Sequence, residues 1–471
     1  MSPPNKKEKI IIVGAGVYGL SSALSFLKDG FEDVHLFDKN DYTTQSYSWF
    51  KGCDSASSDM NKIFRSSYGK QTHYQEMSLE SREVFFEWNK MIAEEGFEGG
   101  DPIYINSGNV HLTDQQELPS FEQETLKAMP KDAIDINDPD AKSKVLGKGL
   151  SDTSVDPFLC KSRGIKLQGI IDTTGGTIIA DKMCRWVLHL CHRHGGSRFK
   201  PRLGSEIEQL LVTHNKVSGG KKCVGIKTKD GELHFSKLVI CHLGAWTAQY
   251  IPEASQKLEA TGGTVALIKI KDPKLLKRFN PENFPPWTYK ARDGVLGGLY
   301  GFPVSSPGGY LKIGYRGIKW INPSGGINSK VKTRYTCDNE TNVPLFGLNL
   351  IKNFLREYLP EIDRITGTRI CWYSDTVDND FLISYCPDYE EDSLFVGAGD
   401  SGHAFMMFGV LGDHIKNIIL GEGDPFLTEL FSWSRKREKL NQINWGLDDP
   451  RALQNVKMAT PRDWIVNRAK M

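Results

Sequence analysis

Apolar residues near the start of the chain follow the pattern of a strand, a helix and a second strand. Residues 10–13 form a continuous run of three isoleucines and a valine, which is typical of a strand buried on both faces. A helical pattern follows over residues 20–27 and ends near Gly30. A second strand-like run at residues 34–37 ends at Asp38.

The turn between the first strand and the helix carries the motif GxGxxG at residues 14–19. Gly14 permits a tight turn, Gly16 lets a pyrophosphate approach the backbone, and Gly19 allows close helix packing. The helix N-terminus then faces the phosphates, and the Asp38 carboxylate can accept hydrogen bonds from a ribose. A glycine turn in an ordinary strand–helix unit would not require the acid. The motif predicts a dinucleotide site but does not separate FAD from NAD.

Later patterns predict a return to the same domain. Residues 181–194 have helical periodicity, Asp230-Gly231 indicates a hairpin, and residues 238–241 and 393–396 read as strands. The glycine-rich segment 397–402 is expected to lack regular structure, and an apolar helical pattern follows from about residue 404 to 420.

Length and composition narrow the function classes. The chain has 471 residues, 39% of them hydrophobic, which suffices for two packed cores. The chain has 59 basic and 58 acidic residues, so its net charge creates no overall electrostatic attraction for a polyanion. Nucleic acid is therefore not an expected partner. Nine cysteines without a CxxC pair indicate a reducing compartment and no metal site. Apolar stretches fall short of the about 20 residues that span a bilayer, so we expect a soluble protein without a membrane partner.

Six further motifs occur along the chain. They are DMNKIFR at 59–65, LGAW at 243–246, YGFP at 300–303, YLKIG at 310–314, RICW at 369–372 and GDSGHAF at 399–405. Their order and content resemble the sarcosine oxidase and fructosyl-amino-acid oxidase (amadoriase) family, which includes pipecolate and saccharopine oxidases. These are FAD-dependent amine oxidases of the DAO superfamily, and the resemblance, of the fungal type, covers most of the chain.

The resemblance implies an α/β (α+β) fold with a Rossmann-like FAD-binding domain assembled from separated segments and a substrate domain with a large mixed sheet. We place residues 1–105, 166–255 and 370–440 in the FAD-binding domain. Residues 106–165 and 256–369 are assigned to the substrate domain, and 441–471 to a C-terminal tail. Residues 430–468, which carry Trp433, Trp445 and Trp464, are expected to cover the FAD domain.

The resemblance also implies the reaction. A family member oxidises the secondary amine of an N-substituted amino acid of the saccharopine, fructosyl amino acid, pipecolate or sarcosine type. Hydride passes to flavin N5, the imine is hydrolysed, and O2 is reduced to H2O2. The expected partners of this monomer are a small-molecule amino acid and O2. The alternatives are an FAD dehydrogenase with another acceptor, a biosynthetic flavoenzyme that closes a ring through an imine, and a flavin-binding module without activity.

The cofactor site that the resemblance implies includes a covalent thioether between FAD and Cys371. Backbone N–H groups of the segment 397–402 and the following helix N-terminus would face the flavin pyrimidine edge. His242 is read as a buried, satisfied histidine. The full set of expected cofactor-binding residues is Gly14, Gly16, Val17, Tyr18, Gly19, Asp38, Lys39, Ser58, Lys62, Ile207, Gly244, Trp246, Cys371, Gly399, Asp400, Ser401, Gly402, His403 and Met406.

Three catalytic roles follow from the resemblance. Lys312 would lie over the flavin face opposite the substrate and promote O2 reduction, although a solvated strand-face lysine is the alternative. Arg65 would pair with the substrate carboxylate, with Lys62 and Tyr68 at the same mouth. On sequence alone, Lys62 and Arg65 also fit a solvated helix edge. Tyr300 either lines the site or belongs to the core.

Two positions depart from the family pattern. Met406 stands where most relatives carry a lysine that shares the substrate carboxylate, and Arg316 stands where relatives carry an acid or a histidine. Arg316 could restore the lost cation or bind a second carboxylate of the substrate. The alternative is a surface residue beside Lys319.

The chain ends Ala469-Lys470-Met471, a conservative variant of the Ser-Lys-Leu peroxisomal address. This tail predicts recognition by the peroxisomal import receptor and a peroxisomal location.

Overall fold

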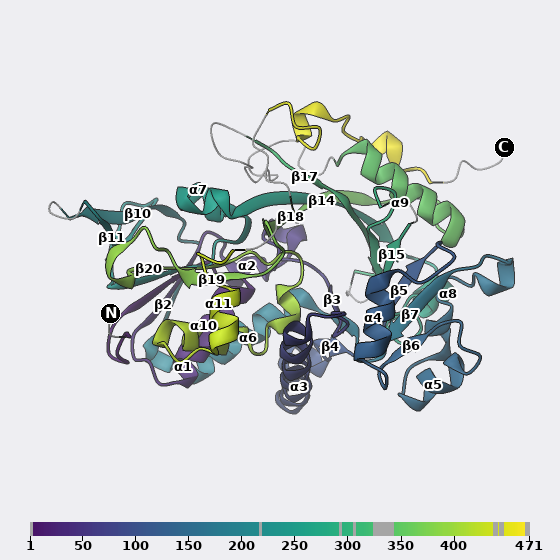
Figure 1. Cartoon of the computed structure of the whole chain (residues 1–471), viewed down its shortest axis with the longest axis horizontal. Coiled ribbons are helices and arrows are strands. Elements are labelled where there is room, and N and C mark those ends of the chain that lie inside the picture. The colour runs from purple at the N-terminus through teal and green to yellow at the C-terminus, as the bar shows by residue number, and fades with distance from the viewer. Residues whose placement is uncertain are drawn as a thin grey trace.

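Two large sheets dominate the computed structural model of the chain and lie side by side in Figure 1. The structure describes residues 3–215, 219–291, 294–304, 308–323, 343–436, 441 and 447–466. One sheet has six strands in the order β19-β20-β13-β1-β2-β9, and the other has eight in the order β18-β14-β17-β16-β15-β5-β7-β6. The predicted mixed α/β class is confirmed.

The six-stranded sheet is parallel except at one edge. Its strands are β1 (Ile10–Val13), β2 (Val34–Asp38), β9 (Phe199–Leu203), β13 (Leu238–Cys241), β19 (Leu382–Tyr385) and β20 (Leu394–Ala398). β1 is central, pairs with β2 and β13, and is buried at all four positions. The strands predicted at 10–13, 34–37, 238–241 and 393–396 are thereby confirmed, because continuous apolar runs suit a sheet covered on both faces.

Helices pack beneath this sheet in the view of Figure 1. They are α1 (Val17–Lys28), α6 (Ala180–Gly195) and α10 (Leu411–Leu420), and α1 contacts both of the others. The contact with α10 is close, because a Cβ at Gly412 would lie 1.9 Å from Ser21 O.

The prediction of one helix over residues 404–420 is wrong. A 3-10 turn covers Ala404–Met407, and α10 begins only at Leu411. Between them the Gly409 amide donates to Ser81 Oγ at 3.0 Å instead of continuing a helix. Likewise Gly397 and Ala398 still belong to β20, so regular structure reaches into the glycine-rich segment.

The eight-stranded sheet is mostly antiparallel, with one parallel pair between β5 and β15. Its strands are β5 (Asn109–Thr113), β6 (Ala133–Asp135), β7 (Gln168–Asp172), β14 (Leu258–Lys269), β15 (Trp287–Lys290), β16 (Leu299–Phe302), β17 (Tyr310–Trp320) and β18 (Gly367–Thr376). The boundaries estimated near residues 165 and 370 cut through this sheet, because β7 pairs with β5 and β18 pairs with β14.

Shorter elements connect the two sheets or cover them. A three-stranded sheet joins β3 (Lys62–Phe64), β8 (Gly176–Ile178) and β4 (Tyr104–Ile105), and another joins β10 (Ile207–His214), β11 (Lys221–Thr228) and β12 (Leu233–Phe235). The β11–β12 pair is the hairpin predicted around Asp230. The remaining helices are α2 (Tyr42–Gln45), α3 (Thr72–Glu95), α4 (Ser120–Ala128), α5 (Ala141–Gly147), α7 (Thr247–Tyr250), α8 (Pro273–Arg278), α9 (Leu345–Tyr358) and α11 (Pro425–Leu430).

The C-terminal segment 447–466 packs on the eight-stranded sheet, whereas Trp433 packs in a core of the six-stranded sheet. The expectation that residues 430–468 cover the FAD domain is therefore wrong for residues 447–466 and holds for the start of the range. Leu453, Ala459 and Val466 are buried in the same core as α9. Arg451 also pairs with Glu259 on β14. The predicted targeting residues 469–471 lie outside the described residues.

The eight cysteines in the described ranges are all buried and unpaired, and Cys337 lies outside these ranges. Over the same ranges no group of three or more His, Cys, Asp or Glu side chains is placed to hold a metal ion. None of the helices in the described part of the chain combines the length and apolar character needed to cross a membrane.

Candidate functional site

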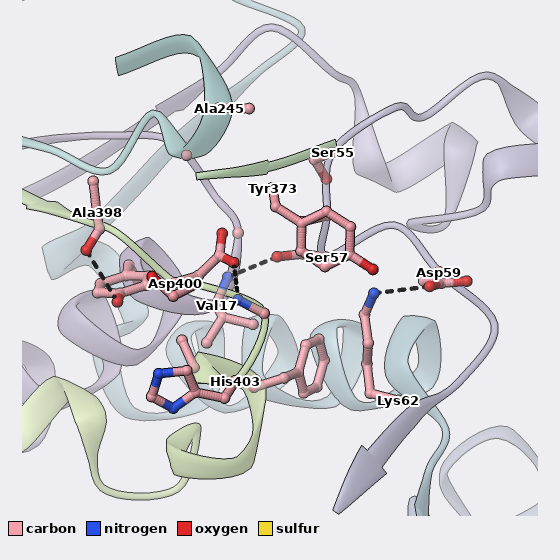
Figure 2. A pocket seen from close by; sticks show the side chains of 18 of the residues that line it. Val17, Ser55, Ser57, Asp59, Lys62, Ala245, Tyr373, Ala398, Asp400 and His403 are labelled. Carbon is pink, nitrogen blue, oxygen red and sulfur yellow. Dashed lines mark hydrogen bonds and ion pairs between the residues drawn. The ribbon is translucent and has the colours of Figure 1, made fainter. Parts of the chain in front are cut away.

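A cavity of about 600 Å³ is lined by residues of both large sheets. Its walls come from residues 13–18, 38–42, 55–65, 242–246 and 398–406, and from the eight-stranded sheet between residues 288 and 316. Figure 2 shows side chains from these distant segments converging on one space.

The glycine turn forms one end of the cavity, where Gly14, Gly16, Val17 and Tyr18 line it. Gly14 has φ +103°, and a Cβ there would lie 2.1 Å from His242 O. Gly19 does not line the cavity, but a Cβ at Gly19 would lie 1.7 Å from Gly14 O. Gly14 and Gly19 therefore have to be glycine, because the backbone or the packing leaves no room for a side chain.

The acid at the end of β2 lies beside this turn. Asp38 Oδ2 accepts from Ala15 N and Oδ1 from Asn40 N, both at 2.8 Å. Burial raises the pKa of Asp38. Next to it, Lys39 lies 4.0 Å from the centre of the Trp246 ring. Lys39, Ile207, Gly244 and Trp246 all line the cavity, as predicted for cofactor contacts.

Ser57, which was not among the predicted site residues, supports the glycine turn at residues 14–19. Ser57 Oγ accepts from Val17 N at 3.0 Å, and Figure 2 shows this contact. The predicted neighbour Ser58 does not line the cavity, whereas Ser55 and Ser57 do. A serine-rich stretch at residues 55–58 is a weak signal, because it does not show which hydroxyl faces inward.

The glycine-rich segment after β20 forms a further wall. Asp400, Ser401, Gly402, His403 and Met406 line the cavity, whereas Gly399 does not. This wall is joined to the glycine turn, since Tyr18 Oη donates to Ala398 O at 3.2 Å.

Two histidines of the cavity wall, the buried His242 and the partly buried His403, are neutral and have fixed ring hydrogens. His242 Nδ1 donates to Gly397 O at 3.1 Å, and its Nε2 accepts from Ser22 Oγ at 3.0 Å. Burial lowers the pKa of His242 to about 4. His403 donates from Nε2 to Asn379 O, accepts from Tyr68 Oη, and has its pKa lowered to about 3 by burial. The reading of His242 as a buried, satisfied histidine is confirmed, and the residue also lines the cavity.

Lys312 projects from β17 into the cavity wall and is 2% exposed. Its Nζ lies 2.8 Å from Asp59 Oδ2 and 2.7 Å from Asn61 O. Burial lowers the pKa of Lys312 to about 8, against the opposing effect of Asp59. The alternative of a solvated lysine is therefore wrong.

Asp59 joins Lys312 to Lys62. Asp59 Oδ2 also accepts from Lys62 Nζ at 2.8 Å (Figure 2). Burial acts to raise the pKa of Asp59, but the two lysines outweigh it and hold this pKa well below its usual range. Asp59 belongs to the DMNKIFR motif, but its role was not predicted, because its contact with Lys312 depends on how two distant segments of the chain pack together.

Arg65 follows β3, so the solvated helix edge considered for Lys62 and Arg65 is wrong. Its guanidinium lies 4.3 Å from the centre of the Tyr68 ring and donates to Ser67 O. Six lysines and arginines of the described residues line the cavity, and Arg65 alone among them has no carboxylate partner.

Tyr300 lines the cavity from β16, which settles the choice between a site residue and a core residue. Its Oη lies 2.9 Å from Tyr373 Oη. Burial raises the pKa of Tyr300 to about 12. Tyr373 was not predicted as a site residue. It lies two positions after Cys371 on β18, so the two side chains point to the same face of the strand, and this spacing could have indicated it.

Cys371 on β18 is buried beside Met60 and the lining residue Tyr373, but it is not itself among the residues that line the cavity. Its Sγ accepts from Arg369 Nη2 at 3.5 Å. Burial acts to raise the pKa of this thiol, but the positive charges of Lys62 and Arg369 outweigh it and lower the pKa.

These features fit a flavin dinucleotide. The cavity lies between two sheets, and its glycine turn, the N-terminus of α1 and Asp38 form the arrangement that binds a pyrophosphate and a ribose. The site thus defines a dinucleotide-binding protein. The profile of the FAD dependent oxidoreductase family (DAO) matches residues 9–418, and the chain belongs to this family.

Known proteins are similar over nearly the whole chain. L-saccharopine oxidase of Schizosaccharomyces pombe is 25% identical over 459 residues, which cover 93% of this chain and 95% of the relative. Monomeric sarcosine oxidase of Bacillus sp. is 24% identical, with coverages of 92% and 98%. The solved fructosyl peptide oxidase from E. terrenum has a TM-score of 0.72 at 19% identity, with coverages of 92% and 94%, which shows a shared fold.

Proposed function

We propose that this protein is an FAD-dependent oxidase that acts on the secondary amine of an N-substituted amino acid and transfers the electrons to O2. The observation that carries the proposal is Arg65, a cavity cation without a carboxylate partner among the described residues. An arginine fork binds a carboxylate through two parallel N–H···O bonds, so Arg65 suits the carboxylate of an amino acid. The similarity to saccharopine and sarcosine oxidases supports this class of substrate.

Bound FAD supplies the two-electron acceptor for hydride from the amine carbon. The resulting imine is released and hydrolysed. The chain contributes a water-poor space that disfavours the charged form of the amine, which leaves a neutral nitrogen ready to lose hydride. Lys312 contributes a fixed positive charge that stabilises negative charge developing on oxygen as O2 is reduced to H2O2.

Covalent attachment of FAD through Cys371 is part of the proposal. Support comes from the lowered pKa of the thiol, since a thiolate is the reactive form of cysteine. The positive charges of Lys62 and Arg369 supply this effect.

A panel assay on the purified holoenzyme tests the function. Oxygen uptake and H2O2 formation are measured with secondary amino acids, with the matching primary amino acids and with secondary amines that lack a carboxylate. We expect turnover of the secondary amino acids only. Arg65→Gln should lower kcat/KM for these substrates about a hundredfold, or roughly 3 kcal/mol, because the substrate carboxylate loses its partner. Lys70→Gln is the control, since Lys70 has an 81% exposed side chain and pairs with Glu124 away from the cavity.

The outcomes separate the alternatives. Turnover with an artificial acceptor and no oxygen uptake would indicate a dehydrogenase. A cyclised product by mass spectrometry would indicate a biosynthetic ring closure through an imine. A yellow protein without turnover on any amine would contradict the proposal and favour a binding module.

We further propose that the protein acts as a monomer in peroxisomes and is carried there by an import receptor that reads residues 469–471. Deletion of these three residues from a fluorescent fusion is expected to disperse a punctate signal that overlaps a peroxisomal marker. An unchanged distribution would contradict this location.

A further inference from the structure

Arg316 lies in the cavity wall, with a side chain that is 17% exposed. It comes from β17, where Lys312, Gly314 and Arg316 share one face because side chains alternate along a strand. At roughly 3.3 Å per residue, the Cα atoms of Lys312 and Arg316 are about 13 Å apart along this wall. The surface alternative for Arg316 is therefore wrong, and the two cations lie at separate points of the cavity.

Neighbouring residues hold the guanidinium of Arg316 in one place. Its Cζ atom lies 3.7 Å from the centre of the Tyr373 ring, and its Nη2 pairs with Asp375 Oδ1. A Cβ at Gly402 would lie 2.5 Å from Arg316 Nη1, so the absent side chain of Gly402 makes room for the guanidinium. Asp375 is buried and also lies 3.4 Å from Lys319 Nζ, so one negative charge faces two positive ones.

Arg316 has more donors than protein partners. A guanidinium carries five N–H groups. One bond goes to Asp375 and one, at 3.3 Å, to Ser401 O, and the described residues give Nε no partner although it is buried. The nearby Asp400 carboxylate accepts from Gly402 N and Ser374 N, so backbone amides satisfy it.

From this arrangement we infer that Arg316 binds a second carboxylate, on the N-substituent of the substrate, and so selects dianionic over neutral N-substituted amino acids. A guanidinium accepts no hydrogen bond, and its strongest bonds are charge-assisted bonds to oxyanions. Arg65 holds the amino acid carboxylate and Arg316 the distant one, with the amine between them. This inference rests on the proposed function and defines its substrate class.

Binding to the oxidised holoenzyme tests the inference without turnover. The probes are (carboxyalkoxy)acetates with one to four methylene groups, in which an ether oxygen replaces the oxidisable amine. They are compared with analogues that carry a primary amide in place of the distal carboxylate, and both series are titrated by the change in the flavin absorption spectrum. For the best spacer we expect the carboxylate to bind at least tenfold more tightly than its amide. Arg316→Met should reduce this ratio to below twofold, because the amide binds similarly before and after the substitution.

Lys319→Met is the matched control, because it removes one positive charge from the same Asp375 cluster and does not line the cavity. It should keep a ratio of fivefold or more. If Arg316→Met fails to fold, Arg316→Lys is measured instead, because it retains the charge without the planar fork. Its ratio of carboxylate affinity to amide affinity should lie between the wild-type value and one.

Two results would overturn the inference. One is a wild-type protein that binds carboxylate and amide equally at every spacer length, and the other is an Arg316→Met protein that keeps the preference. Failure of the proposed function is distinguishable, because it means that no secondary amino acid is oxidised, that neither probe binds, and that Arg65→Gln changes nothing.

Discussion

Lys312 Nζ lies 2.8 Å from Asp59 Oδ2, although 253 positions separate the two residues in the chain. The same oxygen binds Lys62, so one buried carboxylate orients two cations of the cavity wall. Asp59 is therefore a positioning residue for Lys312, and its charge stabilises the buried ammonium group of Lys312 and the partly buried one of Lys62.

Replacing Asp59 by Asn should destabilise the protein by about 3–5 kcal/mol, because removing one partner leaves buried charges uncompensated. Chemical denaturation of the holoenzyme measures this. The double variant Asp59→Asn/Lys312→Met should recover part of the loss. Asp152→Asn, at a surface pair in which its side chain is 45% exposed, should change stability little. Equal losses at both aspartates would contradict this role of Asp59.

The reaction of the reduced enzyme with O2 should slow as the pH rises through about 8. Lys312 is charged below its pKa, which burial lowers to about 8, and only the charged form stabilises the developing superoxide. Stopped-flow measurements from pH 6 to 10 check the profile. Lys312→Met should react about 100-fold more slowly at pH 7 and show no such step. A rate that increases with pH in the wild type would exclude this role.

Cys371→Ser should release the flavin from the denatured protein. Acid precipitation of the wild type is expected to leave the yellow colour in the pellet, and precipitation of the variant should leave it in the supernatant. Cys223→Ser is the control, because Cys223 is equally buried but packs beside β13 in another core. Colour released from the wild-type protein would remove the covalent assignment.

Acid should destabilise the protein between about pH 6.5 and 4 through His242. Its pKa in the folded protein is lowered to about 4, so the unfolded chain binds more protons in this range and stability falls with falling pH. The shift corresponds to a loss of about 3 kcal/mol when both states are titrated. His242→Asn retains a donor toward Gly397 O and should flatten this part of the stability curve. Parallel curves for the two proteins would contradict the prediction.

The sequence was informative where local patterns determine structure. The strand at 10–13, the glycine turn and Asp38 were predicted because apolar runs and positive-φ glycines leave few alternatives. The other candidate cofactor and catalytic residues were named through motifs shared with a family. Of these, Gly16, Val17, Tyr18 and several residues between 400 and 406 line the cavity.

The remainder depends on contacts between distant parts of the chain. The Gly409 amide donates a hydrogen bond to Ser81 Oγ, and this contact interrupts the helix that the apolar pattern over residues 404–420 predicts. The membership of β7 and β18 in the eight-stranded sheet is decided by pairing across many residues. Tyr373 and Asp375 could not be identified as neighbours of Arg316 before the sheet was known, because β17 and β18 do not pair directly but flank β14.

The hydrogen bond from Tyr18 Oη to Ala398 O joins residues that are 380 positions apart. It connects the first nucleotide-binding turn to a wall that is completed only at Met406, in a chain of 471 residues. During synthesis the early strands and α1 can form long before the far wall exists. The geometry implies that the growing chain cannot enclose the cavity until residue 406 has been made, because the last lining segment is part of its wall.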